Sequence, residues 1–124
     1  MNREIKFRLW DSFLNVMTEN AQIYHGFVDV LTTDKSRYVV MQFIGLKDKN
    51  GVDIYEGDIL KNENSERIGV VIYDIYKAYF NVTDNYPETL YNCEMLNEAG
   101  NGWMLYECCV VGNIFENPEL KTEF

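Results

Sequence analysis

Apolar and polar residues alternate in several short stretches of the chain. In the first stretch Ile5, Phe7 and Leu9 alternate with charged residues, and Asp11-Ser12 follows. A period of two is typical of a strand with one buried face, so the pattern predicts a first strand that ends in a turn at Asp11. Residues 13–17 favour no single element. Similar β-branched and aromatic stretches predict strands at residues 22–31, 38–44, 59–61, 68–75, 78–83 and 103–111, the last continuing after Gly112 to Phe115.

The strongest short turn signal is Asn50-Gly51, because both residue types tolerate positive φ. Glu56-Gly57 predicts a second tight turn with Gly57 in the left-handed region. Asp58 follows directly, and its carboxylate is expected to accept hydrogen bonds from backbone amides downstream of it.

Helical signals are few. Residues 87–96 could form one short helix that begins at Pro87 and ends within residues 97–102. Residues 116–120 predict a terminal turn, since a residue that precedes proline favours an extended or turn conformation. Five or six short strands from residue 38 onward favour a small barrel or sandwich.

Length and composition fit an ordinary globular chain. The 124 residues suit one domain, or one domain with a small appendage, and 47% of them are apolar. No apolar run approaches the roughly 18 residues of a membrane span. The mixed-charge start lacks the apolar core of a signal peptide, so we expect a cytoplasmic protein with no membrane partner.

Charge is distributed unevenly along the chain. Residues 1–49 hold seven Lys/Arg and six Asp/Glu, whereas residues 50–124 hold four and fourteen, which gives the total of −9. Nucleic-acid affinity depends on Lys and Arg that replace counterions, so direct binding of nucleic acid by residues 50–124 is disfavoured. The acidity either keeps the protein soluble, which is the simpler interpretation, or meets a basic partner.

The sequence lacks the residues that several kinds of metal, phosphate-binding and catalytic site require. His25 is the single histidine, so multi-histidine metal sites are excluded, and the chain has neither a Cys-x-x-Cys pair nor a glycine-rich phosphate loop. Cys108 and Cys109 would point to opposite faces of a strand, one into the core and one toward the surface. A cysteine nucleophile would need a base. We therefore expect no enzyme and no cofactor.

Four carboxylates crowd eleven residues: Asp48, Asp53, Glu56 and Asp58. Two of them could hold a hard cation or act as an acid–base pair, which would indicate a small hydrolase or metal enzyme. Their position beside turn glycines favours turn structure instead. The spacing of a calcium loop is absent.

Tyrosines gather in the acidic part of the chain. Tyrosine is enriched at the centres of protein interfaces, so the cluster could form an interaction surface. We favour the interpretation that these tyrosines occupy core positions and half-exposed positions at the rim of the fold. The residues are Tyr73, Tyr76, Tyr79, Tyr86, Tyr91 and Tyr106.

Three stretches together carry a family resemblance: Ile5–Asp11, Met41–Leu60 and Val110–Leu120. They resemble the YopX family, small proteins encoded by bacteriophages and prophages. Ile44 stands where the family often has Thr, Phe115 stands where it often has Tyr, and residues 61–109 add no support. The resemblance marks as structural or interacting Trp10, Asp11, Gly45, Leu46, Asp48, Gly51, Tyr55, Glu56, Gly57, Asp58, Gly112, Asn113, Ile114, Asn117 and Pro118.

Within the middle stretch, Tyr55–Ile59 also resembles a strand entry of SH3-like barrels. This analogy concerns fold alone. We therefore expect a mainly β protein with at most one short helix. Residues 38–124 would form an SH3-like barrel core with a C-terminal turn, and residues 1–37 an N-terminal β extension packed on it.

The resemblance implies a mobile-element origin and the cytoplasm of a bacterial host, and it implies no activity. We expect a non-enzymatic accessory protein that binds a host or phage protein. The alternative is an acidic nucleic-acid mimic that blocks a basic DNA-binding partner. Exposed strand edges and many aromatic residues also favour a homo-oligomer.

Overall fold

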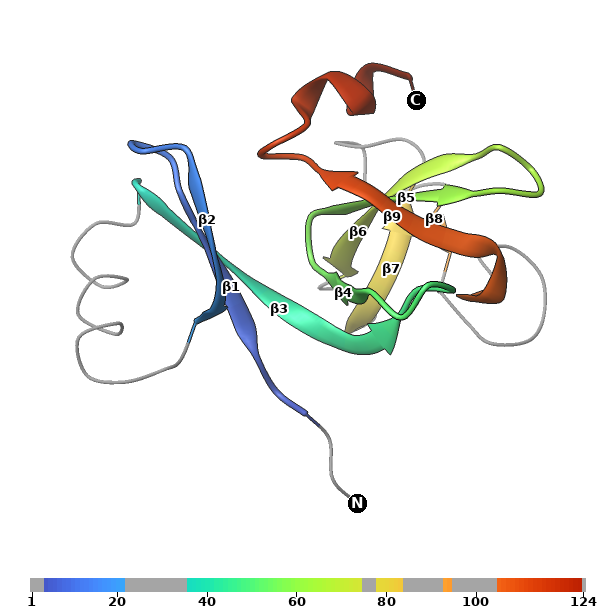
Figure 1. The fold of residues 1–124 in the computed structure, drawn as a ribbon, viewed down its shortest axis with the longest axis horizontal. Helices are drawn as coiled ribbons and strands as arrows, with labels where there is room; N and C mark the ends of the chain where they lie inside the picture. The colour runs from blue at the N-terminus through green and yellow to red at the C-terminus, as the bar shows by residue number, and fades with distance from the viewer. Residues whose placement is uncertain (1–3, 22–35, 75–77, 84–92, 95–104, 124) are drawn as a thin grey trace.

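Two antiparallel sheets make up the computed structural model, which describes residues 4–21, 36–74, 78–83, 93–94 and 105–123. The first sheet has the order β2 (Val16–Ala21), β1 (Phe7–Asp11), β3 (Tyr38–Lys47), β4 (Asp53–Tyr55). The second has the order β8 (Cys93–Glu94), β7 (Tyr79–Thr83), β6 (Ile68–Asp74), β5 (Asp58–Asn62), β9 (Cys108–Asn113). Two 3-10 helices, η1 (Leu105–Glu107) and η2 (Pro118–Glu123), flank β9 (Figure 1).

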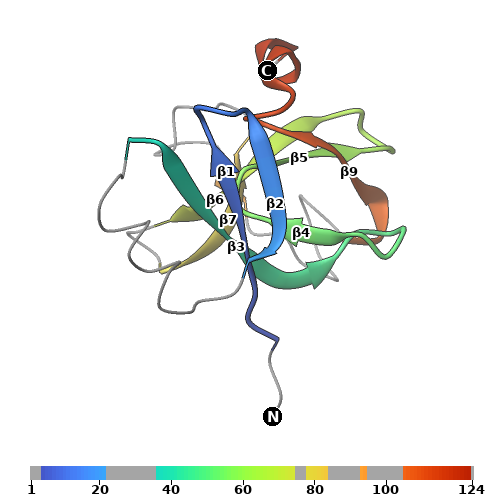
Figure 2. The ribbon, with the colours of Figure 1, turned by 60° about the vertical axis from the view of Figure 1, so that its left-hand side comes forward.

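The long strand β3 connects the two parts of the molecule. Its first half pairs with β1, from Tyr38 to Gln42, and its second half pairs with β4. The register shifts between Phe43 and Lys47, where Gly45 has a φ of 91°. Figures 1 and 2 show β3 running from the β1–β2 hairpin to the second sheet, which curls into a half-barrel.

The core lies inside this half-barrel. Its fully buried members are Ile54, Leu60, Val71, Val82 and Cys108, contributed by five different strands. Val71 and Val82 face each other directly across β6 and β7. Three partly buried residues complete the packing: Ile44, Leu46 and Val110.

The mainly β prediction is confirmed, and so are most of its strands. The first strand, the strand at residues 59–61 and the hairpin of residues 68–83 lie where the alternation places them. The strand predicted at residues 38–44 continues to Lys47. Neither β2 nor β4 was predicted, because β2 is a polar edge strand and β4 has three residues between two turns. The domain boundary predicted after residue 37 falls just before β3.

The C-terminal third corrects three predictions. Cys93 and Glu94 form a strand beside β7 rather than part of a helix. Residues 105–107 form η1, so the predicted strand begins only at Cys108. The terminal turn is the start of η2. The strand predicted at residues 22–31 and most of the predicted helix lie outside the described residues.

In the described part of the chain, no helix has the length and apolar character needed to span a bilayer.

Candidate functional site

The two sheets meet at a buried ion pair between Arg8 of β1 and Asp58 of β5. Nη2 of Arg8 lies 2.8 Å from Oδ1 of Asp58, and their side chains are 6% and 1% exposed. The same nitrogen donates to the backbone oxygen of Glu56 at 3.1 Å. The guanidinium also lies 4.7 Å from the ring centroid of Tyr55, a cation–π contact. Arg8 thus ties the first sheet to the turn that enters the second.

That turn contains the left-handed glycine that the sequence predicts, since Gly57 has a φ of 84°. Its amide donates to the Val71 oxygen, and its own oxygen accepts from Ile114 N. A Cβ at this position would lie 3.3 Å from the Met41 sulfur and 3.5 Å from the Phe115 ring. The site therefore needs a glycine both for its φ and for its close packing.

Asp58 accepts a hydrogen bond from an amide upstream of it, whereas the prediction placed the amides downstream. Its Oδ2 accepts from the amide of Tyr55, three residues upstream, at 2.8 Å. The turn at Gly57 folds the chain back, so the carboxylate meets the preceding strand end rather than the following one. This contact leaves Oδ1 facing Arg8.

The C-terminal motif is a second set of side-chain caps. Oδ1 of Asn113 accepts from the amides of Phe115 and Glu116, and Oδ1 of Asn117 accepts from Asn113 N at 3.2 Å. A Cβ on Gly112 would lie 2.5 Å from Asn117 Oδ1, so a larger residue there would displace the Asn117 side chain that accepts from Asn113 N. Pro118 follows as the first residue of η2.

The first motif stretch packs on this C-terminal turn. The rings of Trp10 and Phe115 stack with centroids 5.7 Å apart. Asp11 caps the hairpin turn, since its Oδ1 accepts from Phe13 N and Leu14 N, and both of its oxygens bond Arg37. The predicted turn at Asp11 is therefore confirmed.

The four crowded carboxylates have separate partners, and two of them, Asp48 and Asp58, accept from amides of their own turns as the turn interpretation expects. Asp48 accepts from the amides of Asn50 and Val52 with one oxygen and from Val110 N with the other. Asp53 pairs with Lys6 and Lys47. No group of three or more potential metal ligands occurs among the described residues. Gly51, beside the Asp48 cap, has a φ of 81° as the turn prediction requires.

Motif residues also line a polar cavity of about 350 Å³ at the sheet junction. Carboxylates outnumber cations in its walls. Burial raises the pKa of Asp58 to about 6, although Arg8 and the Tyr55 amide oppose the rise. The lining residues are Arg8, Glu19, Val52, Asp53, Tyr55, Asp58, Val110, Gly112, Asn113, Glu116 and Asn117.

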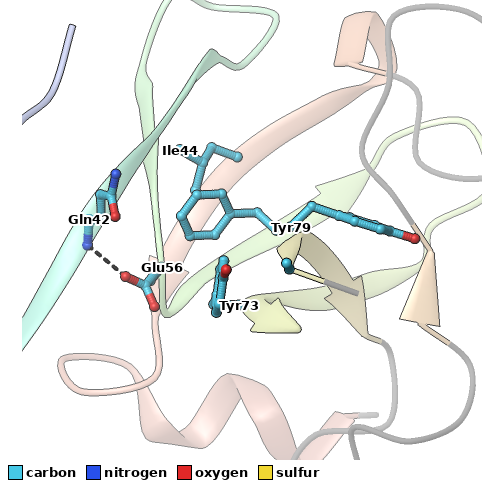
Figure 3. Close-up of a pocket in the computed structure, with 7 residues that line it drawn as sticks. Gln42, Ile44, Glu56, Tyr73 and Tyr79 are labelled. Atoms are coloured by element: carbon cyan, nitrogen blue, oxygen red, sulfur yellow. Dashed lines mark hydrogen bonds between the residues drawn. The ribbon is translucent and has the colours of Figure 1, made fainter. Parts of the chain in front are cut away.

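A larger hollow of about 570 Å³ opens beside Glu56, at the mouth of the half-barrel (Figure 3). We call it the mouth hollow. Oε1 of Glu56 accepts from Gln42 N at 2.9 Å, and burial raises the pKa of this carboxyl. The lining residues are Gln42, Ile44, Glu56, Tyr73, Ala78, Tyr79 and Phe80.

Apolar side chains are exposed at the β1–β2 turn, far along the chain from the tyrosine cluster. Phe13 is 64% exposed, Leu14 is 65% exposed, and Val16 is 48% exposed. We call these three residues the hairpin tip. The alternation along the sequence contains no signal for them. Of the tyrosine cluster, Tyr73 and Tyr106 are exposed and Tyr79 is half-buried, while Tyr76, Tyr86 and Tyr91 lie outside the described residues.

Comparison with known proteins identifies the family. The sequence model of YopX, described as "YopX protein", matches residues 17–121. The chain belongs to the YopX family. The crystal structure of protein EF1440 from Enterococcus faecalis is similar, with 26% identity, a TM-score of 0.65 and coverage of 97% of this chain and 99% of that one. No curated protein matches the chain.

The YopX match leaves out the stretch Ile5–Asp11, yet the structure brings that stretch against the rest of the motif. Arg8 meets Asp58, and Trp10 meets Phe115. Arg8 was not among the predicted motif residues, and a charged residue in an alternating strand gave no reason to expect burial. Most of the YopX motif thus holds two sheets and the C-terminal turn together.

Proposed function

We propose that this YopX protein is a non-enzymatic protein-binding module. It is encoded by a phage or prophage and acts in the cytoplasm of the bacterial host, with an SH3-like barrel in residues 38–124. The exposed hairpin tip carries the proposal. Apolar side chains that the fold does not bury are expected where another protein covers them. The turn beneath is held by Asp11, which accepts from the amides of Phe13 and Leu14 and pairs with Arg37. The Phe13 ring lies 5.0 Å from that guanidinium and still leaves 64% of the residue exposed.

The site chemistry supports a non-enzymatic role. Burial raises the pKa of Cys108 to about 11, which disfavours the reactive thiolate. The pKa of the Cys109 thiol is raised as well, by burial and by the neighbouring Glu63. The buried carboxylates of the motif hold backbone amides or an arginine.

Affinity capture from infected or lysogenic host lysate tests the proposal. The tagged chain is compared with the double variant Phe13→Ser/Leu14→Ser and with Ile5→Ser. Ile5 is equally exposed, at 61%, but lies outside the hairpin tip, so it is the matched control. We expect the parent chain and Ile5→Ser to retain the same partner and the double variant to lose it.

The salt dependence of partner binding distinguishes this function from nucleic-acid mimicry. An apolar interface should persist when salt rises from about 0.1 M to about 1 M, where the screening length falls from about 10 to about 3 Å. A partner that is released by salt and is retained by Phe13→Ser/Leu14→Ser would overturn the hairpin-tip proposal in favour of a mimic. Light scattering on the same variants shows whether the partner is a second copy of the chain.

A further inference from the structure

The mouth hollow continues the core face of the half-barrel to its rim. Val71 pairs with Val82 in the core, and two residues further along the same strands Tyr73 pairs with Phe80. Side chains two positions apart point to the same face of a sheet. The Tyr73 and Phe80 rings pack edge to face, with centroids 5.3 Å apart. The hollow therefore has an aromatic wall, of which Tyr73 is 45% exposed.

Glu56 faces this wall (Figure 3). It is the only residue with a carboxyl group among the described residues that line the hollow. One of its oxygens, Oε1, accepts from Gln42 N. In the described part of the chain, Oε2 has no hydrogen bond. Neither lysine nor arginine lines the hollow in that part of the chain. Among the described residues this carboxylate forms no ion pair, and the charge of Arg8 offsets only part of the effect of burial on its pKa.

We propose that the mouth hollow binds the side chain of a lysine from a partner protein, with its ammonium between Glu56 and the Tyr73 ring and its methylene chain along Phe80. Aromatic faces attract cations, and a carboxylate adds an ion pair. A lysine ammonium is a compact charge that one free oxygen can accept, whereas the arginine fork is best matched by two. The lysine's origin in a protein rests on the proposed function.

Titration of the isotope-labelled protein with Nα-acetyl-lysine methylamide, followed by NMR, tests the site. We expect saturable shifts at the amides of Gln42, Tyr73 and Phe80. The norleucine analogue has the same apolar chain without the charge and should bind about tenfold more weakly, because both cation contacts are lost. The arginine analogue should bind more weakly than lysine.

Two variants sharpen the test. Glu56→Gln keeps an oxygen for Gln42 N and removes the charge, so we expect roughly fivefold weaker lysine binding in a folded protein. Glu66→Gln removes an exposed carboxylate outside the hollow and should leave binding unchanged. Equal binding of lysine and norleucine analogues, or no saturable shift, would overturn the proposal. Because the probe is a small molecule, this result is independent of the partner capture by the hairpin tip.

Discussion

Two aspartate–arginine pairs with the same 2.8 Å closest distance lie in different surroundings. Asp11 and Arg37 pair at the hairpin turn, where the arginine side chain is 28% exposed. Asp58 and Arg8 pair at the sheet junction, where both are buried. The hydrogen bonds from Arg37 lower the pKa of Asp11 to about 2, whereas burial raises that of Asp58 to about 6. Burial, rather than the distance between the charges, decides what each pair does for stability.

Breaking the buried pair should have the largest effect. Arg8→Met leaves the Asp58 carboxylate at the junction without its cation, and loss of one partner from a buried pair costs about 3–5 kcal/mol. Urea denaturation at a pH near 8, where Asp58 is ionised, measures the change. The double variant Arg8→Met/Asp58→Leu should recover part of the loss, since it removes both charges. A loss below about 1 kcal/mol in the single variant would show that the pair is not buried in solution.

A comparison of glycines distinguishes the packed junction from an open turn. Gly57 and Gly51 both have positive φ, but a Cβ would have neighbours within 4 Å only at Gly57. Valine at either site meets backbone strain of about 1–2 kcal/mol, and crowding raises the loss at Gly57 to roughly 2–4 kcal/mol. Thermal unfolding of Gly57→Val and Gly51→Val should show the larger loss at Gly57. Equal losses would contradict the packing of Phe115 and Met41 on that turn.

The contributions of Asp58 and Asp11 to the free energy of unfolding should depend on pH in opposite directions. Because the folded-state pKa of Asp58 is raised, its contribution to stability is fully present below about pH 4 and is lost as the pH rises through about 6. The parent chain should therefore lose roughly 1–3 kcal/mol relative to Asp58→Asn over this interval. Asp58→Asn keeps an acceptor oxygen for Tyr55 N.

Asp11 provides the control for that experiment. Its folded-state pKa is lowered, so its contribution is present above about pH 4 and is lost as the pH falls through about 2. The parent should thus lose its advantage over Asp11→Asn only in strong acid. The opposite result for Asp58 would be a gain in stability of the parent relative to Asp58→Asn between pH 4 and 6. It would mean that Arg8 affects the pKa of Asp58 more than burial does.

The smallest effect is expected at the half-buried pair of Asp11 and Arg37. Arg37→Met removes a partly solvated cation together with its contacts to the Phe13 and Tyr38 rings, so we expect a loss of about 1–2 kcal/mol. The turn amides of Phe13 and Leu14 still bond Asp11 in this variant. Urea denaturation beside Arg8→Met gives the comparison directly. A loss as large as that of Arg8→Met would mean that solvent exposure does not separate the two pairs.

The sequence predicts those parts of the fold whose signal is local. Alternation places the hairpin of β6 and β7, and the need for positive φ identifies the turns at Gly51 and Gly57. The edge strand β2 has no such signal, because its residues Thr18 and Glu19 are polar and it is held by its pairing with β1. Cys93 and Glu94 likewise become a strand only through contact with β7.

The candidate site was predictable only where side chains bond near their own position in the chain. The caps by Asp48 and Asn113 and the left-handed Gly57 are of this kind. The burial of Arg8 depends on a residue fifty positions away, and the mouth hollow depends on three strands meeting. No pattern within a single stretch carries that information.

The stacking of Trp10 on Phe115 has a consequence for the order of events during synthesis. These rings come from opposite ends of the described chain, and at about 5–20 residues per second the ribosome needs roughly 5–20 s to make the chain between them. Until then Trp10 lacks Phe115, and β5 lacks its partner strand β9. Contacts between distant residues also slow folding after release. A nascent chain would therefore spend seconds with Trp10 uncovered, a window in which chaperones can bind it.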